Sequence, residues 1–159
     1  MTERAGGTLV VRRAEVGDLA QVTEIERASF ADPWTPDALA TAMELPHLRF
    51  FVAAEGGGTS SIVVGYVVAL VTGDEGEIAD LAVDPSARRG GIGRLLLGRA
   101  EEEMVRCGVR TIYLEARESN VAALGLYEAR GFEIVGRRRG YYRQPVEDAL
   151  VLRREIAPT

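Results

Sequence analysis

The sequence predicts a single α/β domain in which a mixed, mostly antiparallel sheet of seven strands is flanked by about four helices. Its 159 residues suit one domain, and an apolar fraction of 47% with a charged fraction of 27% is typical of a globular chain that buries a core. Hydrophobic residues alternate in some segments and recur at helical spacing in others, which gives the order β-α-α-β-β-β-α-β-α-β-β. Such a combination of hairpins and crossovers indicates a mixed sheet with helices on its faces.

The first half of the chain carries clear start and stop signals for two helices. Apolar residues follow helical spacing after Val16-Gly17-Asp18, and Thr35 is a good N-cap with Pro36 at the first helical position. Pro46 ends the second helix. The elements expected here are a strand at 8–13, a helix that opens at 16–18 and extends to about 28 or 29, a helix at about 36–44, and strands at 49–55, 62–71 and 77–83. We expect residues 1–7 to be a flexible N-terminus.

The second half begins with a long amphipathic helix over 91–107, because Ile92, Leu96 and Met104 fall on one face. Ser119 can cap a further helix that ends at Arg130-Gly131. Strands at 110–117, 132–137 and 146–154 complete the sheet.

Composition excludes several classes of function. All 19 basic residues are arginine, so lysine nucleophiles and Schiff bases are absent, and a formal net charge of −5 argues against nucleic-acid binding. The single His47 leaves a zinc site without ligands, so no metal is expected. With no apolar run near ~18 residues and no signal core, we expect a cytoplasmic protein that does not bind membranes. The lone Cys107 is expected to be an inert packing residue.

The most informative segment joins a strand to the long helix. Leu81-Ala82-Val83 stops at Asp84-Pro85, and Arg88-Arg89-Gly90-Gly91-Ile92-Gly93 follows. Proline ends the strand, and the unpaired amides of a glycine-flanked helix start suit a pyrophosphate. A dinucleotide fingerprint would need a further glycine where Leu96 stands, and a Walker loop would need a lysine.

A family resemblance appears when this segment is combined with two others. The order of elements, Arg88-Arg89-Gly90-Gly91-Ile92-Gly93, and Asn120 followed by Leu126-Tyr127-Glu128-Ala129-Arg130-Gly131-Phe132 resemble the GNAT family of acetyl-CoA-dependent N-acetyltransferases. Phe30-Ala31-Asp32-Pro33-Trp34, residues 113–120 and Gly140-Tyr141-Tyr142 resemble the RimI branch, which acetylates protein N-termini. The resemblance implies the GNAT fold, acetyl-CoA as co-substrate, and the N-terminal alanine of small-subunit ribosomal protein number eighteen as acceptor.

The same resemblance implies which residues hold acetyl-CoA. The backbone of Leu81, Ala82 and Val83 matches the strand that pairs with the pantetheine arm and points an amide at the thioester oxygen. The turn and helix start match the pyrophosphate site; its residues are Arg88, Arg89, Gly90, Gly91, Ile92, Gly93 and Arg94. Asn120 matches a side-chain contact to the cofactor, although its position is also that of a helix cap.

The catalytic pair implied by the resemblance is Glu115 as general base, directly or through water, and Tyr127 as general acid for the coenzyme A thiolate. This division fits the chemistry, because a neutral amine must lose a proton as it attacks and the departing sulfur must gain one. Without the motif, Glu115 would be interpreted as an ion-pair partner of Arg117, and Tyr127 as a core aromatic with its hydroxyl at the rim.

The acceptor side is less specific. Trp34, Tyr141 and Tyr142 are candidates for the lips of a peptide cleft, or for simple loop aromatics that cover the core. Asp80 stands where relatives often carry asparagine; it could hold the incoming ammonium, assist its deprotonation or be structural. By strand alternation Asp80 is expected to share a sheet face with Ile78 and Ala82.

The expected function is therefore acetyl transfer to a protein N-terminus, by direct attack in a ternary complex, in a monomer or weak homodimer. One alternative is a GNAT enzyme for a small amine or a lysine side chain. Another is a module that binds acyl-CoA without turnover.

Overall fold

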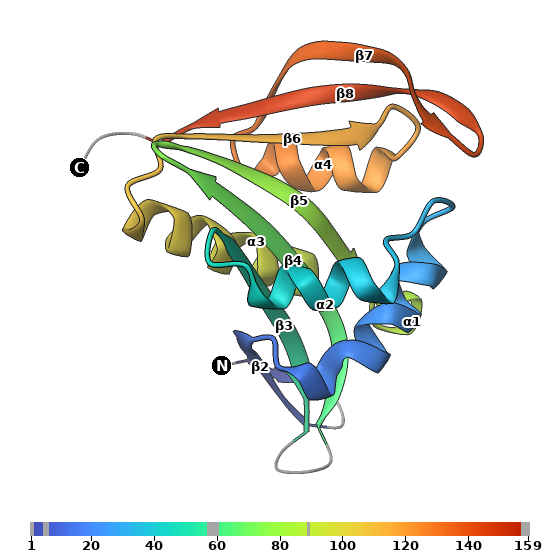
Figure 1. Cartoon of the computed structure of the whole chain (residues 1–159), viewed down its shortest axis with the longest axis vertical. Helices are drawn as coiled ribbons and strands as arrows, with labels where there is room; N and C mark the ends of the chain where they lie inside the picture. The colour runs from blue at the N-terminus through green and yellow to red at the C-terminus, as the bar shows by residue number, and fades with distance from the viewer. Residues whose placement is uncertain (1, 5–6, 57–60, 89, 157–159) are drawn as a thin grey trace.

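The computed structural model describes residues 2–4, 7–56, 61–88 and 90–156. Figure 1 shows one strongly twisted sheet, with α1 and α2 on one face and α3 and α4 on the other. The strands are β1 (Thr2–Arg4), β2 (Gly7–Arg13), β3 (Leu48–Glu55), β4 (Ile62–Thr72), β5 (Glu75–Val83), β6 (Thr111–Arg117), β7 (Glu133–Arg143) and β8 (Val146–Glu155). The helices are α1 (Leu19–Ser29), α2 (Pro36–Glu44), α3 (Ile92–Arg106) and α4 (Val121–Ala129), with short 3₁₀ turns at Val16–Asp18 and Pro85–Ala87.

The predicted order and mixed character of the sheet are confirmed. The strand order is β1-β2-β3-β4-β5-β6-β8-β7, and all neighbours are antiparallel except β5 and β6. The seven predicted strands are β2 to β8, and the three-residue β1 adds an eighth at the edge beside β2. Residues 1, 5 and 6 lie outside the described residues, so a flexible 1–7 segment stays a prediction.

The two parallel strands pair over only part of their length. Glu75 to Ile78 of β5 lie beside Thr111 to Leu114 of β6, and the pairing stops there. Beyond that point β5 continues beside β4 alone, whereas β6 continues beside β8. The sheet therefore opens between β5 and β6 at their carboxyl ends, where ligands bind in many α/β folds.

A bulge in β5 turns Asp80 toward α1. Val68 of β4 lies opposite Asp80 and Ala69 lies opposite Ile78, so Ala79 is an extra residue with no partner. Ile78 packs in the core under α3 and α4, whereas Ala79 and Ala82 pack under α1 and α2. The expectation that Asp80 shares a face with Ile78 was wrong, because the bulge interrupts the alternation on which it rested.

Two further expectations needed correction. Tyr141 and Tyr142 lie within β7, which is longer than predicted, and not in a loop. Cys107 follows the last residue of α3 and is exposed, with its Sγ atom 3.7 Å from the Arg49 guanidinium, so it is not a packing residue.

The opposite end of α3 is shaped by two glycines. Gly91 precedes the helix with a φ of 79°, a left-handed conformation that costs most other residues about 1–2 kcal/mol. A Cβ on Gly93 would lie 3.3 Å from Leu126 and 3.8 Å from Val83, so the helix start lies close against both α4 and β5.

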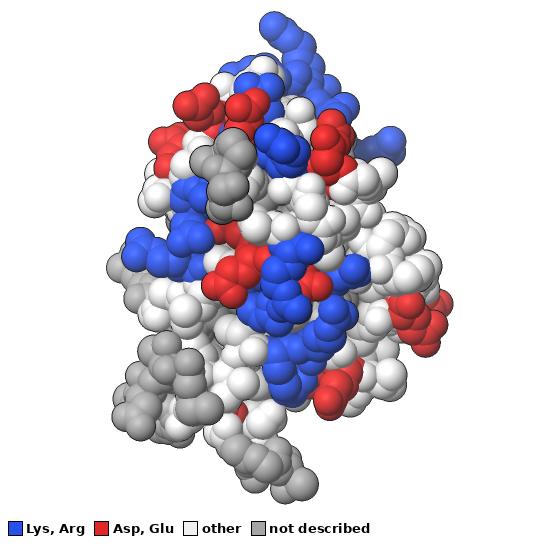
Figure 2. All heavy atoms as spheres, turned by 90° about the vertical axis from the view of Figure 1, so that its left-hand side faces the viewer, with Lys and Arg blue, Asp and Glu red and all other residues white. Residues whose placement is uncertain are grey.

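An arginine cluster joins α3 to the strands beside it. The buried Glu103 carboxylate lies 3.0 Å from Arg49 Nε and 3.4 Å from Arg13, with Arg99 and Arg106 each at 3.8 Å. Figure 2 shows arginines interleaved with acidic side chains over the middle of this face. In the part of the chain that the structure describes, no helix has the length and apolar character to span a membrane.

The conformation of Gly91 predicts a stability effect. Gly91→Ala should lower the free energy of unfolding by about 1 kcal/mol and the melting temperature by a few degrees, because alanine disfavours the left-handed region. Gly125→Ala is the matched control: it lies inside α4 with open space around its Cβ, so it should stabilise by up to about 1 kcal/mol. Thermal unfolding of both variants would show the contrast, and equal shifts would contradict it.

Candidate active site

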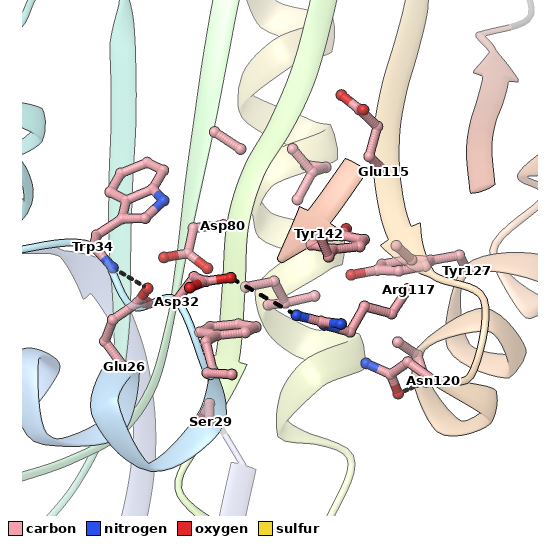
Figure 3. A pocket seen from close by; sticks show the side chains of 17 residues that line it. Glu26, Ser29, Asp32, Trp34, Asp80, Glu115, Arg117, Asn120, Tyr127 and Tyr142 are labelled. Carbon is pink, nitrogen blue, oxygen red and sulfur yellow. Dashed lines mark hydrogen bonds and ion pairs between the residues drawn. The ribbon is translucent and has the colours of Figure 1, made fainter. Parts of the chain in front are cut away.

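A cavity of about 260 Å³ lies where β5 and β6 separate. Residues from α1, the loop after it, β5, β6, α4 and β7 line this cavity, which Figure 3 shows from close by. Four of the lining residues are carboxylic acids and one is an arginine; they are Glu26, Asp32, Asp80, Glu115 and Arg117. An excess of carboxyl groups in a confined space favours a cationic ligand.

Arg117 is already occupied by other partners. Its guanidinium donates to Glu147 Oε1 at 3.1 Å and to the carbonyl oxygen of Pro145 at 3.0 Å, and it stacks 4.3 Å from the centre of the Tyr142 ring. Its nearest contact with a cavity carboxylate is Asp32, at 4.0 Å. The cavity acids are thus left largely without compensation from this arginine.

Glu26 and Asp80 form the floor of the cavity on its α1 side. Glu26 is 1% exposed; one of its oxygens accepts a hydrogen bond from the Tyr66 hydroxyl, and the other accepts from the Trp34 amide at 2.8 Å. Asp80 is 8% exposed, and its Oδ2 atom has no hydrogen-bond partner among the described residues. Burial, reinforced by the adjacent Glu26, raises the pKa of Asp80 to about 9.

Tyr127 lies on α4 and reaches into the same cavity. It is 7% exposed, and its ring packs edge-on against Phe132 with centroids 5.9 Å apart. Burial raises the pKa of the Tyr127 hydroxyl, and the negative charge of Asp80 raises it further. Tyr127 is therefore both a core aromatic and a protonated donor at the cavity wall.

Glu115 lines the cavity from β6, with its carboxylate turned away from Tyr127 in Figure 3. Its Oε2 atom lies 2.6 Å from Arg138 Nε of β7, as an ion pair without hydrogen-bond geometry. The ion-pair partner suggested by sequence position, Arg117, is instead bound to Glu147.

Of the predicted peptide contacts, Trp34 and Tyr142 line the cavity from opposite sides. Tyr141 is 51% exposed and is not among the lining residues. Burial, with the nearby Glu115, raises the pKa of Tyr142 to about 12. The structure thus brings together Trp34, Asp80, Glu115, Tyr127 and Tyr142, and leaves Tyr141 outside.

The residues predicted to hold the cofactor form a path from the cavity to the start of α3. Leu81 lines the cavity, Ala82 is buried, and the carbonyl oxygen of Val83 accepts from Arg88 Nε at 3.1 Å. Ile92 is buried beneath the helix start. Around it Gly90, Gly91, Gly93 and Arg94 are at least partly exposed, and Arg89 lies outside the described residues.

Asn120 has the capping role that its position suggested. Its Oδ1 atom accepts from the Ala123 amide at 3.1 Å, at the start of α4. Asn120 also lines the cavity, so its side chain lies between the helix cap and the cavity interior.

Sequence reasoning missed Glu26. The signal was available, since Glu26 follows Val22 by four residues and so falls on the buried side of α1. A carboxylate at such a position needs partners, and here Tyr66 and the Trp34 amide supply them.

Comparison with known proteins agrees with this geometry. Residues 19–132 match the Acetyltransferase (GNAT) family. The chain belongs to this family of acyltransferases. It is 34% identical over 140 residues to the [ribosomal protein bS18]-alanine N-acetyltransferase of Escherichia coli K12, covering 87% of this chain and 91% of that protein. It is 40% identical over 144 residues to the N-alpha-acetyltransferase RimI of Mycobacterium tuberculosis, covering 87% of each.

Solved structures give the same result. The ribosomal-protein-S18-alanine N-acetyltransferase from Escherichia coli matches with a TM-score of 0.85 and 31% identity, over 96% of each chain. Ard1 from Thermoplasma volcanium matches with a TM-score of 0.84 and 25% identity, over 94% of this chain and 99% of that one. The predicted GNAT fold and the resemblance to the RimI branch are confirmed.

The pKa of Asp80 predicts a pH-dependent stability difference. Since its value in the folded protein, about 9, lies above its usual 3.8, folding favours the protonated form and the protein loses stability as the pH rises between these values. Asp80→Asn removes that loss. At pH 8 its free energy of unfolding should exceed that of the wild type by on the order of a few kcal/mol, and it should unfold at a higher temperature. Thermal unfolding at pH 4 should show little difference, and an equal gap at both pH values would contradict the prediction.

Proposed function

We propose that this protein transfers the acetyl group of acetyl-CoA to the N-terminal α-amine of a protein, with the N-terminal alanine of ribosomal protein bS18 as its substrate. The observation that carries the proposal is the acidic cavity at the opening between β5 and β6, with Glu115 and Tyr127 in its wall. The substrate is supported by the relatives from Escherichia coli and Mycobacterium tuberculosis, which are N-terminal acetyltransferases of nearly the same length as this chain, the first acting on the alanine of ribosomal protein bS18.

The residues present fit acetyl-CoA. Beyond Ile78, the edge of β5 that would face β6 has no ladder partner among the described residues, so backbone groups along it can pair with an extended amide-containing arm; the Val83 carbonyl oxygen already accepts from Arg88. Gly91 provides no side-chain cap to α3, which leaves amides at the start of a 15-residue helix for a pyrophosphate. Arg88 and Arg94 add positive charge beside this helix start.

Acetyl-CoA supplies an activated thioester, and the side chains of this chain handle the protons. Tyr127, protonated and buried, donates to the departing sulfur. Glu115 removes a proton from the attacking nitrogen through an intervening water. A water is needed because the Glu115 carboxylate is directed toward Arg138 and away from Tyr127. Trp34 and Tyr142 hold the first residues of the peptide between them.

The substrate is tested with peptides. The enzyme with acetyl-CoA should acetylate a peptide that carries the N-terminal sequence of bS18 at its α-amine. The same peptide with a blocked N-terminus and an internal lysine should react at least about 100-fold more slowly, because a lysine ammonium holds its proton more tightly by about two pKa units. Mass spectrometry of the products gives the modified site. Preferential acetylation of lysine or of polyamines would contradict the proposed acceptor.

The acid role is tested by Tyr127→Phe. Removing the hydroxyl should lower kcat by about 10²–10³-fold while the Kd for coenzyme A stays within about twofold, since the lost interaction forms only in the transition state. Tyr113→Phe, which removes a hydroxyl on β6 from a residue that does not line the cavity, is the matched control and should leave kcat nearly unchanged. A parallel loss of binding and turnover in Tyr127→Phe would instead indicate a packing role.

A further inference from the structure

The cavity contains two buried acids that the proposed proton transfers do not use. Asp80 lies at the bulge of β5, with one oxygen unpartnered and 8% of the residue exposed. Glu26 lies behind it on α1 and is almost fully buried. Leaving a carboxyl oxygen buried without a donor is costly, so a ligand that supplies a donor would be bound strongly at this point.

The position of Asp80 is opposite the proposed acid. Asp80 rises from β5, whereas Tyr127 comes from α4 across the opening, and the charge of Asp80 is close enough to raise the pKa of Tyr127. An amine bound to Asp80 would therefore lie inside the cavity, on the side bounded by Trp34 and Glu26. Glu115, by contrast, is directed toward Arg138.

We propose that Asp80, backed by Glu26, is the seat of the substrate's α-ammonium group and accepts the proton that this group must lose before it attacks the thioester. Asp80 is thus a catalytic residue and Glu26 a positioning residue, in a role that rests on the proposed function above. The bulge at Ala79 is what turns this carboxyl toward the acceptor side of the sheet.

The side chains that line the cavity complete the proton balance of this reaction. One N–H bond of the ammonium breaks and an O–H bond forms on Asp80. The nitrogen lone pair then forms the C–N bond, the C–S bond breaks, and the Tyr127 hydroxyl protonates the sulfur. A second proton of the nitrogen passes to Glu115, one remains on the amide, and the tyrosine is reprotonated from water. The sum is one amide, one thiol and one released proton.

The acidity of the substrate favours an α-amine at this position. A free α-ammonium has a pKa of roughly 8 and a lysine ammonium roughly 10.4. Because the α-ammonium is the stronger acid, it gives up a proton to the Asp80 carboxylate more readily than a lysine ammonium does. The acid pair thereby favours chain termini over lysine side chains.

The other groups that face Asp80 leave this role intact. Glu26 on α1 and Tyr66 on β4 lie behind it, and Tyr127 on α4 faces it. Tyr66 donates to Glu26, which holds that carboxylate in place. Farther along the cavity wall are Glu115, Asp32, Tyr142 and Arg117, and the arginine is held by Glu147.

Binding of two peptides tests the ammonium seat without turnover. The first begins with alanine; the second carries a propionyl group in its place, which lacks only the amine. With coenzyme A present at pH 8, the wild type should bind the alanine peptide at least 10-fold more tightly than the propionyl peptide. Asp80→Asn should reduce this ratio to about twofold or less, while Glu75→Gln, an exposed acid on the same strand, should keep it. An unchanged ratio in Asp80→Asn would overturn the proposal.

The pH dependence of kcat/KM tests the proton transfer. The proposed step needs an ionised Asp80 together with a protonated ammonium, so the wild-type profile should be bell-shaped: it rises as the carboxyl ionises and falls at high pH as the ammonium loses its proton. In Asp80→Asn it should rise and level off with the free amine. Glu26→Gln should move the rising limb to lower pH, because removing the adjacent negative charge lowers the pKa of Asp80. Identical profiles in all three proteins would overturn the role of the pair.

The two proposals fail in distinguishable ways. If the wild type acetylates no peptide N-terminus, the proposed function is wrong. The ammonium seat is then also wrong if the wild type binds the alanine and propionyl peptides equally well. If the wild type acetylates the peptide and Asp80→Asn matches it in ratio and in pH profile, the proposed function holds and the ammonium seat is wrong.

Discussion

The early end of pairing between the two parallel strands is the constraint on which the rest of the molecule depends. β5 and β6 share four residues of ladder and then separate, each remaining paired to a strand on its other side. The opening therefore costs the sheet little, because every strand keeps one complete neighbour. It also leaves one edge of β5 without a ladder in the interior of the protein, where backbone groups require partners. A ligand with amides along its length meets that requirement.

Charge accumulates at this opening at a cost to stability. Glu26 and Asp80 are buried side by side, and like charges in a desolvated site resist joint ionisation. Elsewhere in the fold, buried acids are matched by arginines: Glu101 pairs with Arg130 and Arg154, and Glu103 lies within the arginine cluster. The contrast shows that the fold readily neutralises carboxylates where it needs only to be stable. At the cavity, Glu26 and Asp80 have no arginine partner among the described residues, and such buried, uncompensated acids are typical of functional sites.

The sequence predicted the elements well because their signals are local. Thr35-Pro36 marks the start of α2, and the strand, proline and glycines around residues 81–93 indicate an anion site whatever the remainder of the chain does. The sequence did not predict the bulge at Ala79, since a bulge is defined by the partner strand and leaves no mark on alternation within its own. It also assigned Glu115 to the wrong arginine, because Arg138 reaches it from a strand that is distant in sequence. Contacts between distant strands, rather than motifs, decide how the acceptor side is built.

The two faces of β5 lie in different packing environments. Leu81 and Val83 pack on the α3 side, and Asp80 and Ala82 face α1. A substitution at position 80 therefore changes the α1 side of the strand without touching the side chains that pack against α3. The bulge thus lets the two sides of one strand be altered independently, because a change of side chain on one side leaves the packing on the other side in place.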